Sequence, residues 1–358
     1  MKLYAQHGSL AGEKVIEGFN GKFLDGVIFS PRDVGLDNLN KAVGEIKKAN
    51  GKADRLFDPQ YYTCMLAVGD DVRLGYLPQD YTSYFTSRRR PDLTKEATIK
   101  EDIKKALRFQ KSLDVTHFIS PNVLLSKSFD SREASIAIDF LSLAGECYKE
   151  LKDKRPLLLT IAVSRDALLD RKAMTEFMNE VTGLGLSAHG VYLLVAANSA
   201  ESRLDILHSD VVSAWMYFNY ALRTNGFDVV NGYSDILAPL LCAAGGSAGA
   251  TGWWSNLRAF SLDKFNAGPG GGKLPTQRYL SVALWNRITF AELDQLRKLE
   301  PAVINGLATD ALYDEAEGSE PQRNKEVLQS WDALKAMLGF TAKGTIEEKL
   351  NGCQKRIK

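Results

Sequence analysis

The sequence has few cysteines, and those it has stand far apart. Cys64, Cys147, Cys242 and Cys353 form no Cys-x-x-Cys pair and no Cys/His cluster. A structural zinc ion and a disulfide framework both need such clustering, so neither is predicted. Cys147 and Cys242 occur in apolar stretches of helical periodicity, where cysteine packs as a small hydrophobic residue. This usage is typical of a reducing compartment and favours a cytoplasmic protein.

Long hydrophobic runs are absent as well. No apolar stretch approaches the ~18 residues of a membrane-spanning helix, and residues 1–8 lack the apolar segment of a signal peptide. Basic and acidic residues nearly balance, 45 against 44, so the net charge of +1 demands neither nucleic acid nor a membrane surface as a partner. With 45% hydrophobic and 25% charged residues, the composition is that of an ordinary globular protein.

Several motifs that carry known chemistry are missing. The chain has no Walker phosphate-binding motif and no Gly-x-Ser-x-Gly nucleophile elbow, and residues 8–12 match the dinucleotide fingerprint Gly-x-Gly-x-x-Gly poorly. Where a first-strand His-x-His metal pair would stand, there is only His7. A metal ion held by His7, Asp58 and other carboxylates is an alternative, but no metal site is predicted, and the sequence leaves any cofactor unknown. Paired carboxylates for glycoside hydrolysis would have to be aspartates, because glutamate is absent from the predicted strand ends.

What the sequence does contain is a regular alternation of short apolar runs, often β-branched, with segments of helical periodicity. This alternation predicts βα units around a parallel sheet. Eight strands are predicted, at residues 2–7, 26–30, 53–58, 116–120, 157–164, 190–196, 227–232 and 248–254. Eight such units resemble the TIM-barrel superfold, which implies an α/β fold: a (β/α)8 barrel over residues 1–260 with a mostly helical C-terminal extension over residues 261–358. A doubly wound open sheet is the alternative.

Two regions interrupt the alternation. Residues 61–95 form a long loop rich in tyrosine that contains Arg88, Arg89 and Arg90, and such a loop suits a nucleic-acid backbone or a nucleotide phosphate. A glycine-rich connector at residues 268–272 leads into the extension. Further on, Trp331 and Leu334 belong to the apolar face of a helix that should pack against the outside of the barrel.

The catalytic residues should stand at the C-terminal ends of the strands, because barrels of this kind build their sites there. His7 and Asp58 are the predicted acid/base pair. The ordinary pKa of histidine lies near neutrality, and a carboxylate that closes an apolar strand is costly unless it is paired or functional. We expect the two side chains to share one cavity with at least one of Arg32, Arg165 and Arg258.

The substrate-binding residues are predicted from the same strand ends. The turns after the seventh and eighth strands of barrels often bind phosphate through glycine backbones and the start of a short helix. The full predicted set is Arg32, Asn122, Arg165, Asn231, Ser234, Gly252, Asn256 and Arg258.

The predicted function is that of a barrel enzyme, of hydrolase or transferase type, which acts on a phosphate-bearing or nucleotide-like ligand by general acid/base chemistry. The alternative is a non-catalytic barrel that docks a protein or nucleic-acid partner through its long loop and its tail. Fold alone does not choose between them, because this architecture carries many unrelated functions.

Overall fold

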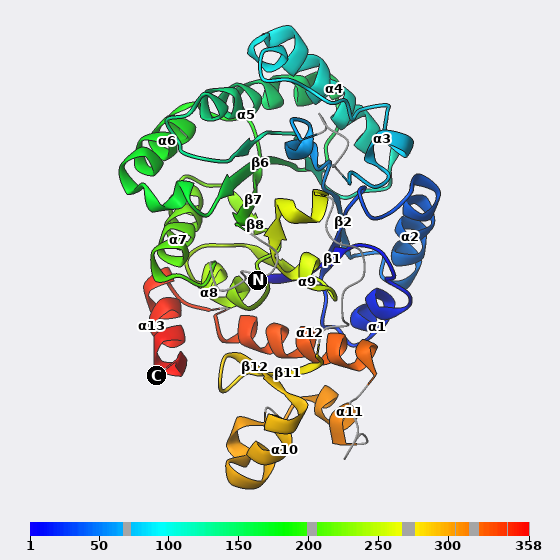
Figure 1. Cartoon of the computed structure of the whole chain (residues 1–358), viewed down its shortest axis with the longest axis vertical. Coiled ribbons are helices and arrows are strands. Elements are labelled where there is room, and N and C mark those ends of the chain that lie inside the picture. The colour runs from blue at the N-terminus through cyan, green and yellow to red at the C-terminus, as the bar shows by residue number, and fades with distance from the viewer. Residues whose placement is uncertain are drawn as a thin grey trace.

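The structure is a computed structural model, and it describes residues 1–66, 73–198, 206–266, 276–304, 306–314, 322–341 and 343–357. Eight parallel strands form its centre (Figure 1): β1 (Lys2–His7), β2 (Gly26–Phe29), β3 (Asp54–Phe57), β4 (Phe118–Ile119), β6 (Leu157–Ser164), β7 (Gly190–Ala197), β8 (Asp228–Asn231) and β9 (Ala248–Thr251). Two short strands, β5 (Leu124–Leu125) and β10 (Phe260–Ser261), pair with β6 and β7.

The strands close almost completely into a barrel. Their order is β3-β2-β1-β9-β8-β7-β6-β4, so β3 and β4 are the two ends of the sheet. The backbone N–H of Thr116 donates to the Arg55 carbonyl (2.7 Å), and the Arg55 N–H donates to the Thr116 hydroxyl (2.8 Å). These bonds join β3 to the segment before β4. The predicted (β/α)8 barrel is thereby confirmed, and the open sheet is excluded.

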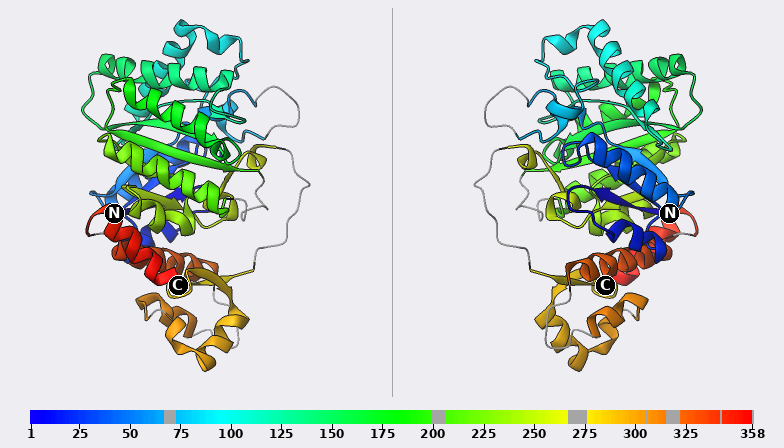
Figure 2. Two further views of the ribbon diagram at one scale, coloured as in Figure 1. Left: turned by 90° about the vertical axis from the view of Figure 1, so that its left-hand side faces the viewer. Right: turned by 90° about the vertical axis from the view of Figure 1, so that its right-hand side faces the viewer.

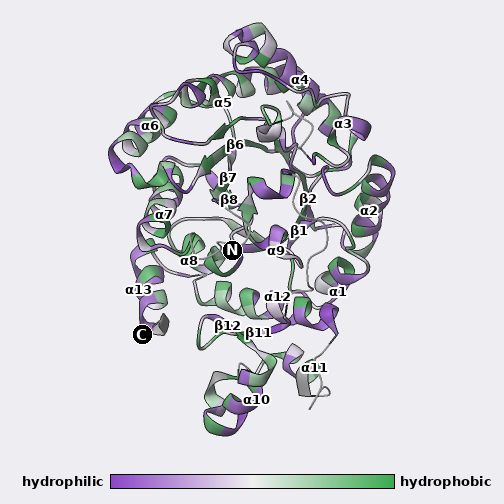
Figure 3. Ribbon diagram, in the orientation of Figure 1, coloured by the Kyte–Doolittle hydropathy of each residue, from purple (hydrophilic) through white to green (hydrophobic). Residues whose placement is uncertain are grey.

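Helices surround the barrel because each carries an apolar stripe that must be buried against the sheet. In α2, for example, Leu39, Val43 and Ile46 recur at helical spacing and are buried. In Figure 3 the ring helices show green and purple sides, while β6 and β7 are green. The helices that follow the first seven strands are α1 (Lys14–Asn20), α2 (Leu36–Ala49), α4 (Glu96–Ser112), α5 (Arg132–Leu151), α6 (Arg171–Gly183), α7 (Ser209–Thr224) and α8 (Ala238–Ala243).

The eighth helix of the ring comes from the tail. After β9 the chain forms only the short α9 (Ser255–Arg258), and α12 (Arg323–Phe340) lies between α1 and α8 and contacts β1 (Figure 1). Trp331 and Leu334 of α12 are fully buried, as the apolar face predicted. A Cβ atom at Gly18 would lie 3.0 Å from the Trp331 ring, so glycine at this position lets α1 approach α12 closely. The extension thus completes the ring instead of lying outside a finished barrel.

The rest of the described tail forms a small module and a last helix. A hairpin of β11 (Arg278–Ser281) and β12 (Asn286–Thr289) precedes α10 (Phe290–Leu299) and α11 (Ala311–Asp314). Figures 1 and 2 show this module outside the ring, beside α12, where the Gln329 side chain bonds both backbone groups of Leu280. The final helix α13 (Ile346–Ile357) contacts α8. The predicted glycine-rich connector lies outside the described residues.

The described parts of the loop, residues 61–66 and 73–95, largely belong to the core. It contains the short helices η1 (Tyr61–Thr63), α3 (Leu77–Asp80) and η2 (Asp92–Thr94). Tyr81 and Tyr84 are fully buried and pack against Phe57 and Phe109, with ring centroids 5.0 to 5.9 Å apart. Most of its aromatic residues therefore stabilise the barrel and present no stacking surface. No helix in the described ranges is long and apolar enough to cross a membrane.

Candidate functional site

A buried polar cluster lies just beyond the C-terminal end of β3. Asp58 has no solvent exposure, and its carboxylate accepts hydrogen bonds from the backbone N–H of Gln60 (2.9 Å), the Tyr62 hydroxyl (2.9 Å) and the Tyr192 hydroxyl (3.3 Å). Gln60 has a left-handed backbone (φ 50°), which turns the chain so that the Asp58 carboxylate can accept from an N–H two residues later.

Burial controls the charge of this cluster. Desolvation raises the pKa of Asp58 to about 6, although the hydrogen bonds from Gln60 and Tyr62 and the positive charge of Lys264 act in the opposite direction. Desolvation, followed by the charge of Asp58, also raises the pKa values of Tyr62 and Tyr192 well above their ordinary range, so both hydroxyls remain donors. A carboxyl group with a pKa near neutrality is suited both to accept and to donate a proton.

Lys264 adds a positive charge near the Asp58 carboxylate. It belongs to η6 (Leu262–Phe265), and only 8% of the residue is exposed. Its ammonium group donates to the Tyr233 hydroxyl (3.0 Å) and lies 4.7 and 4.9 Å from the ring centres of Tyr233 and Phe265. The guanidinium of Arg32 bonds the Lys264 carbonyl and lies over the Phe265 ring, 5.4 Å from its centre. Arg32 therefore holds η6 over this end of the barrel.

His7 has different surroundings. It lines a cavity of about 470 Å³ with Asp33, between the loops that follow β1 and β2. Asp58 is not among the lining residues, so this cavity does not unite the predicted pair. Burial lowers the pKa of His7 to about 4 although Asp33 acts to raise it, and the imidazole is therefore neutral at physiological pH. Arg32 forms an ion pair with Asp33 instead of facing both predicted catalytic groups.

Four buried polar atoms near the ends of the first three strands have no hydrogen-bond partner within the described parts of the chain. They are Gln6 Oε1, His7 Nδ1, Asp33 Oδ2 and Gln60 Nε2. Buried polar atoms are normally satisfied by protein groups, water or a ligand. This concentration of acceptors and donors makes the β1–β3 side of the mouth one place suited to a polar ligand.

Several of the predicted binding residues serve the fold. Asn122 donates to the carbonyls of Thr160 and Ala137 and accepts from the Val123 N–H. Asn231 bonds Trp215 and Asn219, which fastens β8 to α7. The Ser234 hydroxyl donates to the Asn231 carbonyl and accepts from the Ala250 N–H. A Cβ atom at Gly252 would lie 2.4 Å from Leu257 Cβ, so this glycine permits close packing of the turn after β9.

The remaining candidates lie nearer to solvent. Arg165 forms an ion pair with Asp166 (2.7 Å). Asn256 is half-buried, and its Oδ1 atom has no partner among the described groups. Arg258 donates through Nε to the Gly252 carbonyl (3.1 Å) and pairs with Glu326 of α12 (3.5 Å).

Arg258 belongs to a second site, which we call the arginine pocket. This cavity of about 220 Å³ lies where the turn after β9 meets the hairpin and the start of α12. Among the described residues, its basic lining residues are Arg258, Arg278, Arg287 and Arg323, and its acidic one is Glu326. The last three arginines come from the tail and were not among the predicted site residues, because no local pattern reveals that the tail reaches the turn after β9.

Arg287 is one of the well-enclosed residues of this pocket. Its side chain is 11% exposed, and it pairs with Asp235 (2.8 Å) and donates to the Ser330 hydroxyl (2.7 Å). Its Nε atom is buried without a hydrogen-bond partner among the described residues. A smaller cavity of about 160 Å³ shares Arg258 and Arg287 with the arginine pocket. It is also lined by Tyr233, whose hydroxyl accepts from Lys264 beside the Asp58 cluster.

The arginine run predicted to contact nucleic acid is mostly engaged in ion pairs. Arg88 bonds both carboxylate oxygens of the fully buried Asp102 (2.6 and 2.8 Å), and Arg90 pairs with Glu133. Arg89 is exposed. Nucleic-acid binding at this run stays a prediction.

Fold and site together define the class of this protein as a TIM-type α/β barrel with a charged C-terminal mouth. Within the described ranges there is no group of three or more His, Cys, Asp or Glu residues that could hold a metal ion. No protein-family model matches the sequence, and no curated protein is similar enough to count as a relative.

Proposed function

We propose that the barrel is an enzyme that binds a phosphate-bearing ligand in the arginine pocket and transfers a proton at Asp58. The observation that carries this proposal is the arginine pocket itself, in which Arg258, Arg278, Arg287 and Arg323 line one small cavity. The planar guanidinium group presents paired N–H donors that match phosphate oxygens, and arginine is preferred for such recognition. The pocket also lies beside the turn after the eighth barrel strand, where barrels often bind phosphate.

The electrostatics of the pocket support an anion more strongly than a neutral ligand. Arg258 pairs with Glu326 and Arg287 pairs with Asp235, and guanidinium groups make up most of the charged lining that the described residues give this cavity. The buried Nε–H of Arg287 would gain a hydrogen-bond acceptor from a bound phosphate. The cavity volume of about 220 Å³ suits a phosphate group with part of its ester, while the rest of the ligand extends towards Tyr233.

Proton transfer is assigned to Asp58 because this carboxyl group combines burial, a pKa near neutrality and fixed donors. Tyr62 and Tyr192 orient the carboxylate, and Lys264 offsets its negative charge when it ionises. Asp58 is fully buried, so reaction at this carboxyl requires the residues that cover it to move aside. The complete burial of Asp58 favours the alternative, a non-catalytic barrel. That alternative predicts that the phosphate-bearing ligand binds but is not converted to a product.

The test is thermal unfolding with inorganic pyrophosphate and nucleoside diphosphates, because a ligand that binds the native state raises its apparent stability. We expect these ligands to raise the unfolding temperature of the wild type. The rise should be much smaller for Arg258→Lys, which keeps the charge but loses the planar donor pair. Arg171→Gln, at an exposed arginine of α6, is the matched control and should respond like the wild type.

Two outcomes decide the proposal. If no phosphate compound stabilises the wild type, or if Arg171→Gln loses the response as fully as Arg258→Lys, the arginine pocket is not the binding site. Ligands that bind are then incubated with the protein and followed by phosphorus NMR. Turnover that disappears in Asp58→Asn, while ligand stabilisation persists, supports proton transfer at Asp58. Binding without any change in the ligand would instead support the non-catalytic barrel.

A further inference from the structure

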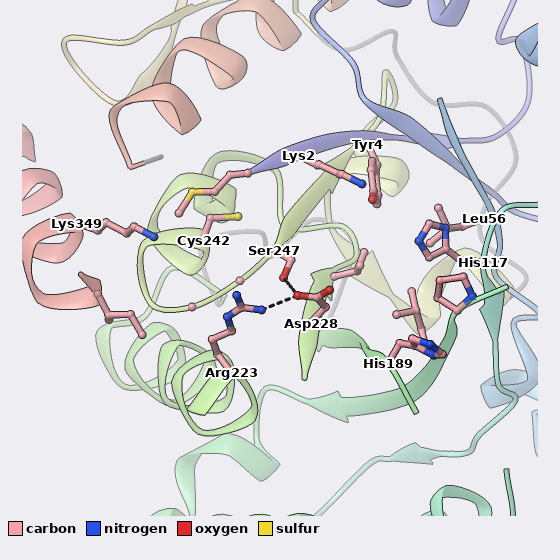
Figure 4. A pocket seen from close by; sticks show the side chains of 17 residues that line it. Lys2, Tyr4, Leu56, His117, His189, Arg223, Asp228, Cys242, Ser247 and Lys349 are labelled. Carbon is pink, nitrogen blue, oxygen red and sulfur yellow. Dashed lines mark hydrogen bonds and ion pairs between the residues drawn. The ribbon is translucent and has the colours of Figure 1, made fainter. Parts of the chain in front are cut away.

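A cavity of about 510 Å³ opens on the face of the barrel where the strands begin, at the end opposite Asp58. Figure 4 shows the side chains that line it. His117 and His189 stand one residue before β4 and β7, and Asp228 begins β8. Lys349 of α13 lies at one side. Barrels ordinarily use this face for stability, yet the volume is within the range of small-molecule sites.

The carboxylates near the cavity already have cationic partners. Asp228 pairs with Arg223 (2.6 Å), and Asp54 pairs with Lys2 (2.6 Å). Each carboxylate also accepts a hydrogen bond from a hydroxyl group: Asp228 from Ser247 (2.8 Å) and Asp54 from Tyr4 (2.7 Å). The acids are therefore satisfied within the protein and do not require a cationic ligand.

The two imidazoles have defined hydrogen bonds on one side. The Nδ1 atom of His189 accepts from the Leu157 N–H (3.2 Å), so its neutral ring carries the proton on Nε2 and has a donor left there. The Nδ1 atom of His117 lies 2.8 Å from the Thr116 hydroxyl, which itself donates to the Arg55 carbonyl (3.2 Å). Nδ1 is therefore the protonated atom of neutral His117, and a second proton would make Nε2 a donor.

An ammonium group also lines the cavity. Lys349 is half-buried on α13 and has no ion pair within the described part of the chain. Apolar side chains complete the wall, among them Leu56, Leu158, Val230 and Ile346. The cavity thus offers hydrogen-bond donors and a positive charge beside an apolar surface.

We propose that this cavity binds a small organic anion, whose carboxylate or phosphate group contacts Lys349 and His189 while its apolar part packs against the barrel strands. None of these residues takes part in the proposed function. The site therefore stands or falls independently of Asp58 and the arginine pocket.

Binding at this site should be coupled to protonation of His117. Burial lowers the pKa of His117, the charge of Asp54 raises it, Lys2 and His189 lower it, and Asp228 raises it. An anion placed in the cavity would favour the protonated ring, so the complex takes up a proton. Affinity for a carboxylate should consequently increase as the pH falls from the ordinary histidine pKa of 6.5 to about 5.5.

The experiment uses three compounds with one ring and different head groups: naphthoate, naphthyl phosphate and the neutral naphthamide. The chain has 4 histidines, so imidazole NMR resolves each ring separately. We expect the two anions to shift the signals of His117 and His189 but not those of His7 at the opposite mouth or the exposed His208. The anion that binds more tightly identifies the head group. Naphthoate stays ionised over this pH range and serves for the pH series.

Lys349→Gln should weaken naphthoate binding roughly tenfold, because the variant loses a hydrogen bond between charged groups, and the free energy of such a bond corresponds to about this change in affinity. Lys355→Gln alters an exposed lysine on the same helix and should bind like the wild type. Naphthamide binding as tightly as naphthoate, a shift of His7 in place of His117 and His189, or no shift at millimolar concentration would overturn the proposal. So would equal loss in both lysine variants.

Discussion

Burial determines what individual charged residues do in this protein. Asp102 and Asp58 are both fully buried carboxyl groups, but their partners differ. Asp102 receives both donors of the Arg88 fork, whereas Asp58 receives neutral hydroxyls and lies near, but not in contact with, a cation. A buried ion pair of the first kind is costly to break and anchors the loop. The second arrangement leaves the carboxyl group able to change its charge.

The raised pKa of Asp58 predicts a pH-dependent stability. Because the folded pKa exceeds the ordinary value, the native state binds the proton more tightly than the unfolded chain does. This contribution to stability is complete below the ordinary pKa of 3.8 and is lost as the pH rises through about 6. The difference between these two pKa values corresponds to roughly 3 kcal/mol.

We therefore expect Asp58→Asn to gain stability relative to the wild type, by up to about 3 kcal/mol, between acidic and neutral pH. Urea unfolding at a series of pH values measures this difference. Asp166→Asn, at a half-exposed strand-end carboxylate, is the control and should follow the wild-type pH profile. A pH-independent difference for Asp58→Asn would show that burial does not raise the pKa of this carboxyl group.

The sequence alone could point to site residues at strand ends, but not to those that the packing of distant segments brings in. Position at a strand end drew attention to Asp58 and Arg258, because the direction of a parallel strand fixes the face on which its last residues lie. The sequence did not single out the residues that complete the two sites. These are Lys264 beside the Asp58 cluster, and Arg278, Arg287 and Arg323 in the arginine pocket. Their approach depends on how the tail packs, and no periodicity in the sequence records that.

At the scale of elements, apolar periodicity predicted the strands and helices without any knowledge of function. The strands are short and apolar because helices or side chains cover both of their faces, so each appears as a continuous hydrophobic run. The apolar face of α12 was equally readable, with Trp331 and Leu334 at helical spacing. The pattern does not reveal which surface the apolar face of α12 packs against, and the structure shows that it is formed by α1, α8 and β1.

The role of α12 as a ring helix predicts a large effect of its central residue. Trp331→Ala should destabilise the protein by about 3 to 5 kcal/mol, because the cavity left by a buried tryptophan relaxes only partly. Trp331→Phe should cost less, since it keeps an aromatic ring and removes an indole N–H that has no hydrogen-bond partner among the described residues. Leu299→Ala, at a side chain of α10 with 77% exposure, is the control for hydrophobic truncation.

Urea unfolding followed by circular dichroism measures these variants. The loss in Trp331→Ala should appear in the main transition of the barrel, because α12 is continuous with its core. A separate, earlier transition confined to the tail would contradict the assignment of α12 to the ring.

For the whole molecule, the N-terminal 260 residues do not contain every part of the barrel. The described residues form one large core that includes Trp331, Leu334 and Met337, and a small separate core in the module around Tyr279, Ile288 and Leu293. A domain boundary near residue 260 therefore marks where the regular βα alternation stops, not where the barrel is complete.

A chain truncated after residue 266 should fail to fold cooperatively. It would keep all eight strands but expose the surfaces of α1, α8 and β1 that α12 covers. We expect a broadened denaturation curve with a reduced dependence on urea, together with binding of a hydrophobic dye, as compact states with incomplete packing show. A sharp transition like that of the full chain would mean that seven helices suffice.

The distance along the chain between β1 and α12 also matters while the protein is being made. A ribosome releases β1 first, but the helix that covers this strand is synthesised more than three hundred residues later. Until then the outer surface of β1, and the facing sides of α1 and α8, remain open to water and to other nascent chains. The ring helix added last thus determines when this protein first becomes a finished, aggregation-resistant molecule in the cell.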